Sequence, residues 1–222
     1  MSRAWLVLLN LLLIAAIVGV AFFWQPQFAE PPLPGTHAAR QGQDAAAFGP
    51  ASPPVGGDFT LAGPAGPVSL HDFAGKLVLL QFGYTYCPDI CPTSLALLSE
   101  ALGRLVPVEA ARVQALFVSV DPERDDAARL AEYTAFFHPA ILGLTGEPQA
   151  LAEIASRYGA VFSRQANAAG GYTIDHTALT YLIDGQGRLV ASLPHATPVE
   201  RLVAEIRRHL PPSSTKGVQH EP

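Results

Sequence analysis

The sequence predicts an α/β protein, a mixed sheet flanked by helices on both faces that follows a single amino-terminal transmembrane helix. Three observations predict this arrangement. Residues 4–24 are almost wholly apolar, which is typical of a membrane span. Residues 77–82 and 113–120 are continuous apolar runs, as strands buried on both faces need. Segments with helical spacing alternate with these runs, and an antiparallel hairpin and a last helix follow them.

The apolar run extends from Ala4 to Trp24. Asn10 is its only strongly polar side chain, and Trp5 and Trp24 bracket it as interfacial aromatic residues do. At helical rise the distance from Trp5 to Trp24 is roughly 28 Å, close to the roughly 30 Å of a bilayer core. The alternative is a cleaved secretory signal, whose apolar region covers about 7–15 residues and ends in a small-residue cleavage site. We interpret residues 4–24 as an uncleaved signal anchor.

The sequence on either side of this run predicts where the protein lies. Arg3 and the amino terminus precede the run and an acidic, proline-rich stretch follows it, so we expect residues 1–3 in the cytoplasm. A stub of this length is too short for a mitochondrial transit peptide, which favours a bacterial inner membrane with the domain facing the periplasm. The cysteines would then face an oxidising compartment. The formal net charge is −5, so the composition does not indicate the basic surface that a nucleic-acid-binding protein needs.

The rest of the chain divides into three parts. Residues 25–54 contain seven prolines and three glycines and have no hydrophobic period, so they predict a semi-extended spacer. Residues 55–210 are enough for one domain with its own core, and residues 211–222 predict a polar, flexible tail.

The predicted elements of the domain follow from apolar periodicity and from turn residues. They are a hairpin of 58–61 and 68–70, a strand at 77–82, a helix with core positions Leu95, Leu98, Leu102 and Leu105, a strand at 113–120, a helix at 127–137, a strand at 141–144, a helix at 148–158, strands at 178–183 and 189–192, and a helix at about 198–210. Residues 165–171 are expected to form either a mobile flap or an ordinary hairpin loop.

Cys87 and Cys91 are the only cysteines of the chain. They are either a redox couple or two soft ligands for a metal ion. They follow the first buried strand, and Pro92 stands where the first turn of the next helix would begin, a position that lowers the pKa of a thiol. Three residues separate them, whereas ordinary thiol oxidoreductases have two. Because an isolated motif of this kind is weak, the spacing alone leaves a simple disulfide open.

Histidine is the usual nitrogen partner of thiolates at copper and zinc sites, and His176 is the candidate. It leads into the strand at 178–183, which should lie near the cysteine loop, while His195 is a weaker alternative in a loop. Asp89 lies between the cysteines, but a carboxylate is a hard donor, so we interpret Asp89 as shaping the loop or tuning its charge. The other histidines lie in the spacer, in the tail or at element ends: His37, His71, His138, His209 and His220.

Four segments, taken together and in order, resemble the signature blocks of the Sco/SenC family. They are Gly83–Pro92, Ser119–Asp125, Leu144–Gly146 and Asp175–Thr177, and the resemblance covers about residues 55–210. It implies a thioredoxin-like, membrane-anchored copper protein that helps to assemble the copper centre of cytochrome c oxidase subunit II. It also implies that Cys87, Cys91 and His176 are the copper ligands. The residues directly before Leu179 are His176-Thr177-Ala178, with no proline among them. Ordinary thioredoxin-like reductases carry a cis-proline before the corresponding strand, and this proline docks the substrate chain.

The leading hypothesis is therefore a copper metallochaperone that holds one copper ion, as Cu(I) and in a second state as Cu(II). Its expected partners are the oxidase subunit and other copper-handling proteins. The alternative is a thiol-disulfide reductase, in which Cys87 and Cys91 would be the catalytic residues and keep the subunit's copper-binding cysteines reduced. A redox or copper sensor is a third hypothesis.

Two further features have more than one interpretation. Tyr84 and Tyr86 flank the cysteines, where they would gate solvent, contact a partner, or pack as aromatic residues at strand ends commonly do. Residues 121–126 are acidic, and they predict either a loop that docks a partner or a turn followed by a helix whose dipole the acids complement.

Overall fold

The structure is a computed structural model that describes residues 17, 54–167 and 170–212. The chain divides into two compact units, 1–48 and 49–222, and every described residue except Ile17 belongs to the second. The expectations for the stub at 1–3, the anchor at 4–24, the spacer at 25–54 and the tail at 211–222 concern residues that lie almost entirely outside the described part. Within the described residues, no helix is long and apolar enough to cross a membrane.

The domain is built on a five-stranded mixed sheet with the order β5-β4-β3-β8-β9. The central strand is β3 (Leu77–Gly83), all seven residues of which are buried, as its continuous apolar run predicts. It pairs in parallel with β4 (Val113–Ser119), which pairs in parallel with β5 (Ile141–Leu144). On its other side β3 pairs antiparallel with β8 (Leu179–Ile183), and β8 pairs antiparallel with β9 (Leu189–Pro194). The predicted mixed sheet is confirmed.

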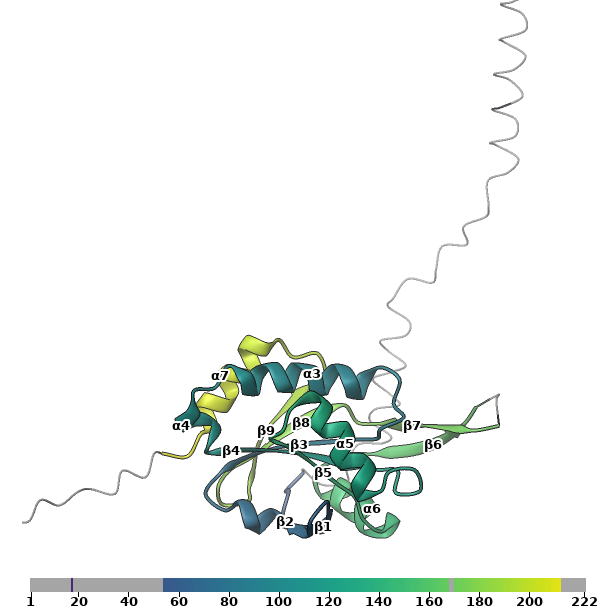
Figure 1. Cartoon of the computed structure of the whole chain (residues 1–222), viewed down its shortest axis with the longest axis horizontal. Coiled ribbons are helices and arrows are strands. Elements are labelled where there is room, and N and C mark those ends of the chain that lie inside the picture. The colour runs from purple at the N-terminus through teal and green to yellow at the C-terminus, as the bar shows by residue number, and fades with distance from the viewer. Residues whose placement is uncertain (1–16, 18–53, 168–169, 213–222) are drawn as a thin grey trace, which may run out of the picture. The chain divides into compact units, whose positions relative to one another are not determined.

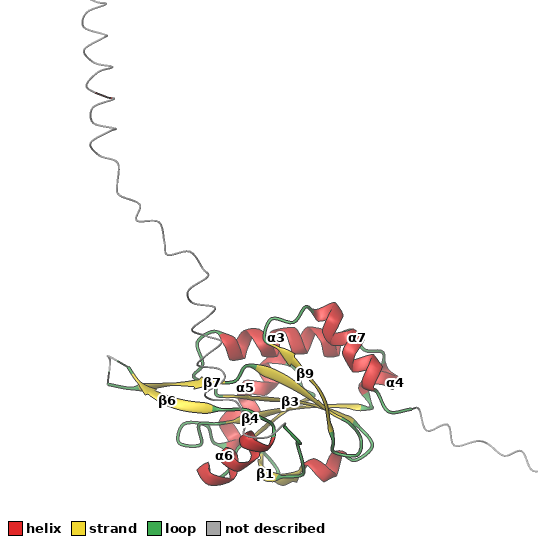
Figure 2. Cartoon of the chain, turned by 180° about the vertical axis from the view of Figure 1, so that it is seen from behind, coloured by secondary structure: helices red, strands yellow, loops and turns green. Residues whose placement is uncertain are grey.

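Helices and a small hairpin cover the sheet. On one side α3 (Ile90–Gly103) and α7 (Val199–His209) pack together, with the short α4 (Pro107–Ala110) near the end of α7 (Figure 1). On the opposite side lie α6 (Pro148–Arg157) and the hairpin of β1 (Thr60–Gly63) and β2 (Gly66–Ser69), which the 3-10 helix η1 (Leu70–Phe73) follows (Figure 2). The helix α5 (Ala127–Phe137) packs against β5. The core between these layers is therefore closed on both faces of the sheet.

One element stands apart from the central sheet. Strands β6 (Phe162–Ala166) and β7 (Tyr172–His176) form a separate two-stranded antiparallel sheet. In both views this hairpin extends beyond the edge of the domain (Figures 1 and 2). Residues 163–166 of β6 are all exposed, whereas Ile174 of β7 is buried.

Most predicted elements lie where the sequence places them, with ends that shift by one or two residues. One expectation needs correction. The helix after the cysteines ends at Gly103, so Leu105 packs in the core from the following turn and not from the helix. Of the two expectations for residues 165–171, the described residues support the ordinary hairpin, since β6 ends at Ala166 and pairs antiparallel with β7, which begins at Tyr172.

Candidate metal centre

The two cysteines lie where β3 ends and α3 begins. A tight turn follows Gly83, with the Cys87 N–H donating to the Tyr84 carbonyl at 3.2 Å, and α3 begins at Ile90. Cys91 is the second residue of the helix and is 3% exposed, whereas Cys87 precedes the helix and is half-buried. Neither cysteine forms a disulfide, and the Cys91 N–H donates to the Cys87 sulfur at 3.4 Å.

A shared helical face does not bring the two cysteines together. Residues four apart would share a helical face only if Pro88 and Asp89 were helical, and they are not. The sulfurs converge because the loop folds Cys87 back over the amino-terminal end of α3. Asp89 precedes the helix but its carboxylate makes no capping hydrogen bond, and its backbone N–H stabilises the Cys87 thiolate.

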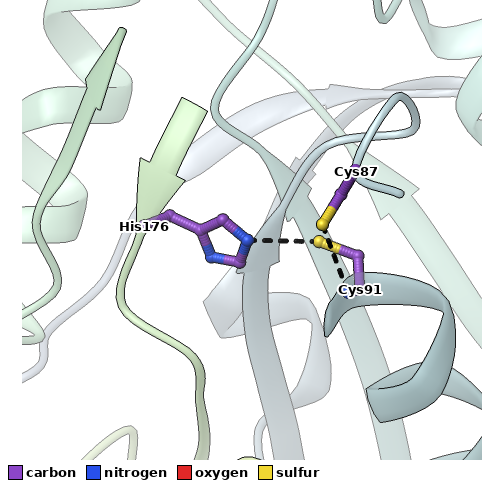
Figure 3. Close-up of side chains that lie close together, drawn as sticks. All are labelled: Cys87, Cys91 and His176. Carbon is purple, nitrogen blue, oxygen red and sulfur yellow. Dashed lines mark hydrogen bonds between the residues drawn. The ribbon is translucent and has the colours of Figure 1, made fainter. Parts of the chain in front are cut away.

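His176 reaches the cysteines from the hairpin. Gln81 of β3 pairs with Thr180 of β8, so the chain just before β8 lies beyond the carboxyl end of β3, where the cysteine loop starts. His176 is the last residue of β7 and only three residues before Leu179. Its Nε2 lies 3.3 Å from the Cys91 Sγ, and Figure 3 marks this contact with a dashed line.

The three side chains form a compact donor set. The Cys87 Sγ, the Cys91 Sγ and a ring nitrogen of His176 all lie within 4.8 Å of one another. Three ligands spaced evenly around an ion at bond lengths of about 2.3 Å would be about 4 Å apart, so small movements would place all three on one ion. Within the described residues this is the only group of three such side chains that meets this criterion.

The second nitrogen of His176 fixes the orientation of the ring. The Nδ1 lies 3.2 Å from the Thr177 carbonyl oxygen. A carbonyl only accepts, so Nδ1 donates in this hydrogen bond, and Nε2 is the ring nitrogen that faces the sulfurs. Metal-binding histidines are commonly oriented in this way by a partner of the other nitrogen.

The pKa values of Cys87 and Cys91 are shifted in opposite directions. The pKa of Cys87 is lowered to about 3, first because its thiolate accepts a hydrogen bond from the Cys91 thiol, against the opposing effect of burial. The pKa of Cys91 is raised because its thiol donates that bond and because it is buried. At neutral pH the pair therefore shares one proton, with the negative charge on the more accessible sulfur.

Asp125 holds the cysteine loop in place through hydrogen bonds. Its fully buried carboxylate accepts from the Thr85 N–H at 2.8 Å, from the Thr85 hydroxyl at 2.6 Å and from the Ser119 hydroxyl at 2.6 Å. Asp126 next to it caps α5 by accepting from the Arg129 N–H at 2.7 Å. The acidic segment at 121–126 is thus a turn and helix start, as one interpretation held, and part of it also supports the site.

Gly83 provides the space that Cys91 needs. A Cβ at this position would lie 2.7 Å from the Cys91 Sγ and 2.7 Å from the Phe117 ring. Beside the site, a cavity of about 10 Å³ between Cys91, Ser94 and His176 has room for about one water molecule. The sequence did not predict the roles of Gly83 and Asp125, although both lie in segments that resemble the signature blocks, because these roles depend on contacts with residues further along the chain.

The other candidates lie outside the donor set. His195 bonds to the Ser94 hydroxyl at 2.7 Å through Nδ1, and so contacts α3 but is not in the group. Tyr84 is a packing residue: it is 2% exposed and its ring edge meets the His176 ring, with 5.9 Å between centroids. Tyr86 is 52% exposed and stacks with the guanidinium of Arg129 at 4.4 Å.

Comparison with known proteins decides the family. The model of the SCO1/SenC family matches residues 49–211. The chain belongs to the SCO1/SenC family. A curated relative, the mitochondrial SCO2 homolog of Mus musculus, is 38% identical over 157 residues, which are 69% of this chain and 62% of the relative. The chain thus spans less than two thirds of the length of that SCO2 homolog.

Solved structures of Sco proteins share this architecture. The apo Sco1 protein from Thermus thermophilus matches with a TM-score of 0.64 and 43% identity, over 72% of this chain and 95% of that one. The ScoI of Bradyrhizobium japonicum, solved with copper bound, matches with a TM-score of 0.64 and 41% identity, over 70% of this chain and 99% of that one. The mixed, thioredoxin-like sheet flanked by helices is therefore confirmed.

Proposed function

We propose that this SCO1/SenC protein is a membrane-anchored copper metallochaperone that holds one copper ion between Cys87, Cys91 and His176. One observation carries the proposal: two sulfurs and one imidazole nitrogen, from segments 85 residues apart, lie within 4.8 Å of one another. Soft thiolates with one borderline nitrogen suit Cu(I), and a second state with Cu(II) is part of the proposal. A relative of similar fold has been solved with copper bound.

The arrangement suits an ion that is passed on. A site with three ligands leaves a position for a ligand of the recipient, and Cys87 is half-buried, so an exchanging ligand can reach it. Sco proteins are copper-binding proteins of cytochrome c oxidase assembly. We propose that the recipient is the copper centre of oxidase subunit II, with other copper-handling proteins as further partners. We also propose that residues 4–24 anchor the domain to a bacterial inner membrane, on the periplasmic side.

A titration of the reduced full chain with Cu(I) tests the copper site. The chain is purified in a mild detergent and a competing chelator sets the free Cu(I). We expect one tightly bound copper per chain, and a loss of affinity of more than about 100-fold in both Cys87→Ser and His176→Ala. His195→Ala is the matched control, because His195 lies beside α3 but outside the donor set, and it should retain the affinity. Unchanged affinity in His176→Ala would refute the three-ligand site.

A second function, thiol-disulfide reduction, is favoured by the protonation of the pair. The pKa of Cys87 near 3 leaves a thiolate at neutral pH on the accessible sulfur. That thiolate would attack a partner disulfide, forming a mixed disulfide and releasing one partner thiolate. Cys91, losing its proton to water, would then attack the Cys87 sulfur, releasing the second partner thiolate and leaving a Cys87–Cys91 disulfide, a two-electron transfer.

A stoichiometric assay separates the two functions. The reduced chain is mixed with a peptide that carries a disulfide between two cysteines, and the released thiols are counted. Reduction should persist in His176→Ala and vanish in Cys87→Ser, because the reaction needs the sulfurs but not the imidazole. Absence of reduction by the wild-type chain would exclude this second function.

A further inference from the structure

The strand that carries His176 lacks a backbone ladder to the central sheet. Strand β7 pairs with β6 only, in a sheet separate from the one that ends at the cysteines. Its link to β8 is covalent and lies at one end, so its other end needs a different support. The position of the imidazole relative to Cys91 therefore depends on what holds β7 against the domain.

Three alternate residues of β7 face the domain. Tyr172 and His176 are partly buried and Ile174 is 6% exposed, whereas Thr173 and Asp175 between them are exposed. The Ile174 N–H donates to the Tyr84 hydroxyl at 3.2 Å, and the same Tyr84 ring meets the ring of His176. Side chains thus contact the strand at its middle and at its end.

Arg124 contacts Tyr172, the first residue of β7. Its guanidinium carbon lies 3.7 Å from the centre of the Tyr172 ring, and its Nη1 donates to the Tyr172 carbonyl at 3.1 Å. Asp121 completes the arrangement, because its buried carboxylate accepts from the Arg124 Nε at 2.5 Å and from the Tyr172 hydroxyl at 2.8 Å. The guanidinium also lies over the Tyr84 ring at 5.6 Å.

The same loop supports the sulfur side of the site. Asp125 follows Arg124 directly and holds the cysteine loop through Thr85. Residues 121–125 therefore hold both parts of the donor set, one through Thr85 and the other through Tyr172. Tyr84 of the cysteine loop contacts β7 directly as well, and Glu123 of the 121–125 loop pairs with Arg164 of β6 at 2.7 Å.

We propose that Arg124 is a positioning residue, which fixes β7 against the domain through Tyr172 and thereby sets the place of the His176 imidazole relative to Cys91. This inference deepens the proposed copper function and rests on it for its biological meaning. The placement of the strand, however, is a property of the copper-free protein and is measurable without the metal.

Hydrogen exchange followed by mass spectrometry tests the placement directly. The full chain is compared with Arg124→Met, reduced and free of copper. We expect exchange at residues 172–176 to become about tenfold faster while β3 at residues 77–83 is unchanged. Arg124→Lys should restore part of the protection, because it keeps the charge over the Tyr172 ring but not the planar fork. Unchanged exchange at 172–176, or an equal increase in β3, would overturn the proposal.

Two further variants make the result specific. Arg188→Met is the matched control, since Arg188 also pairs with an aspartate, Asp184 at 2.7 Å, but at the end of the sheet remote from the site. It should leave residues 172–176 unchanged. If Arg124→Met does not fold, Tyr84→Phe removes only the hydroxyl that accepts from the Ile174 N–H, and should speed exchange at that amide.

A double-mutant cycle with copper tests whether Arg124 acts through His176. Arg124→Met should weaken Cu(I) binding by about 10–100-fold in the wild-type chain, and by less than about twofold in the His176→Ala background. Equal losses in both backgrounds would contradict the proposal. If His176→Ala itself binds Cu(I) like the wild type, the copper site fails, whereas the exchange measurement still decides the role of Arg124.

Discussion

The two parts of the candidate site are held in different ways. The cysteine segment, residues 82–92, continues directly from a strand whose every residue is buried and passes into a helix, so backbone hydrogen bonds and one buried carboxylate fix it. The hairpin of β6 and β7 is largely exposed and contacts the domain through side chains. The sulfurs are therefore placed by local structure, and the nitrogen is placed by long-range contacts.

This difference would suit the proposed copper site, which has to accept and release an ion. A firmly held pair of sulfurs would keep the ion bound, while a ligand on a separate hairpin could move without unfolding the sheet. It also predicts which substitutions disturb which part. Three experiments test the comparison, beginning with the largest expected effect.

The reactivity of the two thiols tests whether the cysteine segment is fixed. The pKa of Cys87 near 3 means that it stays a thiolate as the pH falls to about 4, and becomes a thiol only below that, whereas Cys91 stays protonated. At pH 5 iodoacetamide should therefore modify Cys87 at least about 1,000-fold faster than Cys91. Peptide mass spectrometry of the full chain measures both rates.

The denatured chain is the control for this selectivity. In urea both thiols return to an ordinary pKa of about 8.5, so at pH 5 they should react slowly and at similar rates. Similar rates in the folded chain would show that the cysteine segment moves freely, and the comparison would then fail.

Asp125→Ala tests the buried anchor of the cysteine segment. It removes three hydrogen bonds to a fully buried carboxylate and leaves the Ser119 hydroxyl without that partner, so the free energy of unfolding should fall by about 3 kcal/mol. Asp126→Ala, which removes only the cap of α5, should cost about 1 kcal/mol. Urea denaturation followed by circular dichroism measures both. Equal losses would contradict the anchoring role of Asp125.

Gly83→Ala tests how closely the segment is packed. The added methyl would meet the Cys91 sulfur and the Phe117 ring at 2.7 Å, so we expect a loss of about 2 kcal/mol from overpacking, with weaker Cu(I) binding. Gly103→Ala is the matched control at the end of α3, where the methyl meets open space, and it should change stability little or raise it. A neutral Gly83→Ala would show that Cys91 can shift freely.

The contrast between the buried sheet and the exposed hairpin also explains which parts of the fold can be predicted from the sequence. The sheet and most helices are predictable because their buried faces require long apolar runs or helical periods. The hairpin is not, because β6 is polar and exposed, and β7 has one fully buried residue, Ile174. β6 shows no apolar alternation, and the alternation of β7 rests on Tyr172 and Ile174 alone.

The candidate site divides in the same way. Cys87 and Cys91 are predictable from their type and their place before a helix, and His176 from the residues around it. Asp125, Gly83 and Arg124 are not, because their effects depend on contacts with residues 40, 8 and 48 positions away, respectively. Such contacts leave no periodicity, and a glycine at the end of a strand or a charged residue in a loop has many ordinary explanations.

The unequal exposure of the two sulfurs has a consequence for the order of chemical events. Cys91 is 3% exposed beside a cavity with room for about one water, whereas Cys87 is reachable from solvent. Any incoming sulfur, whether it comes to share an ion or to exchange a disulfide, therefore meets Cys87 first. Because the Cys91 sulfur is buried, an incoming ligand or thiol can approach the site only from the side of Cys87. Each exchange therefore begins at the Cys87 sulfur.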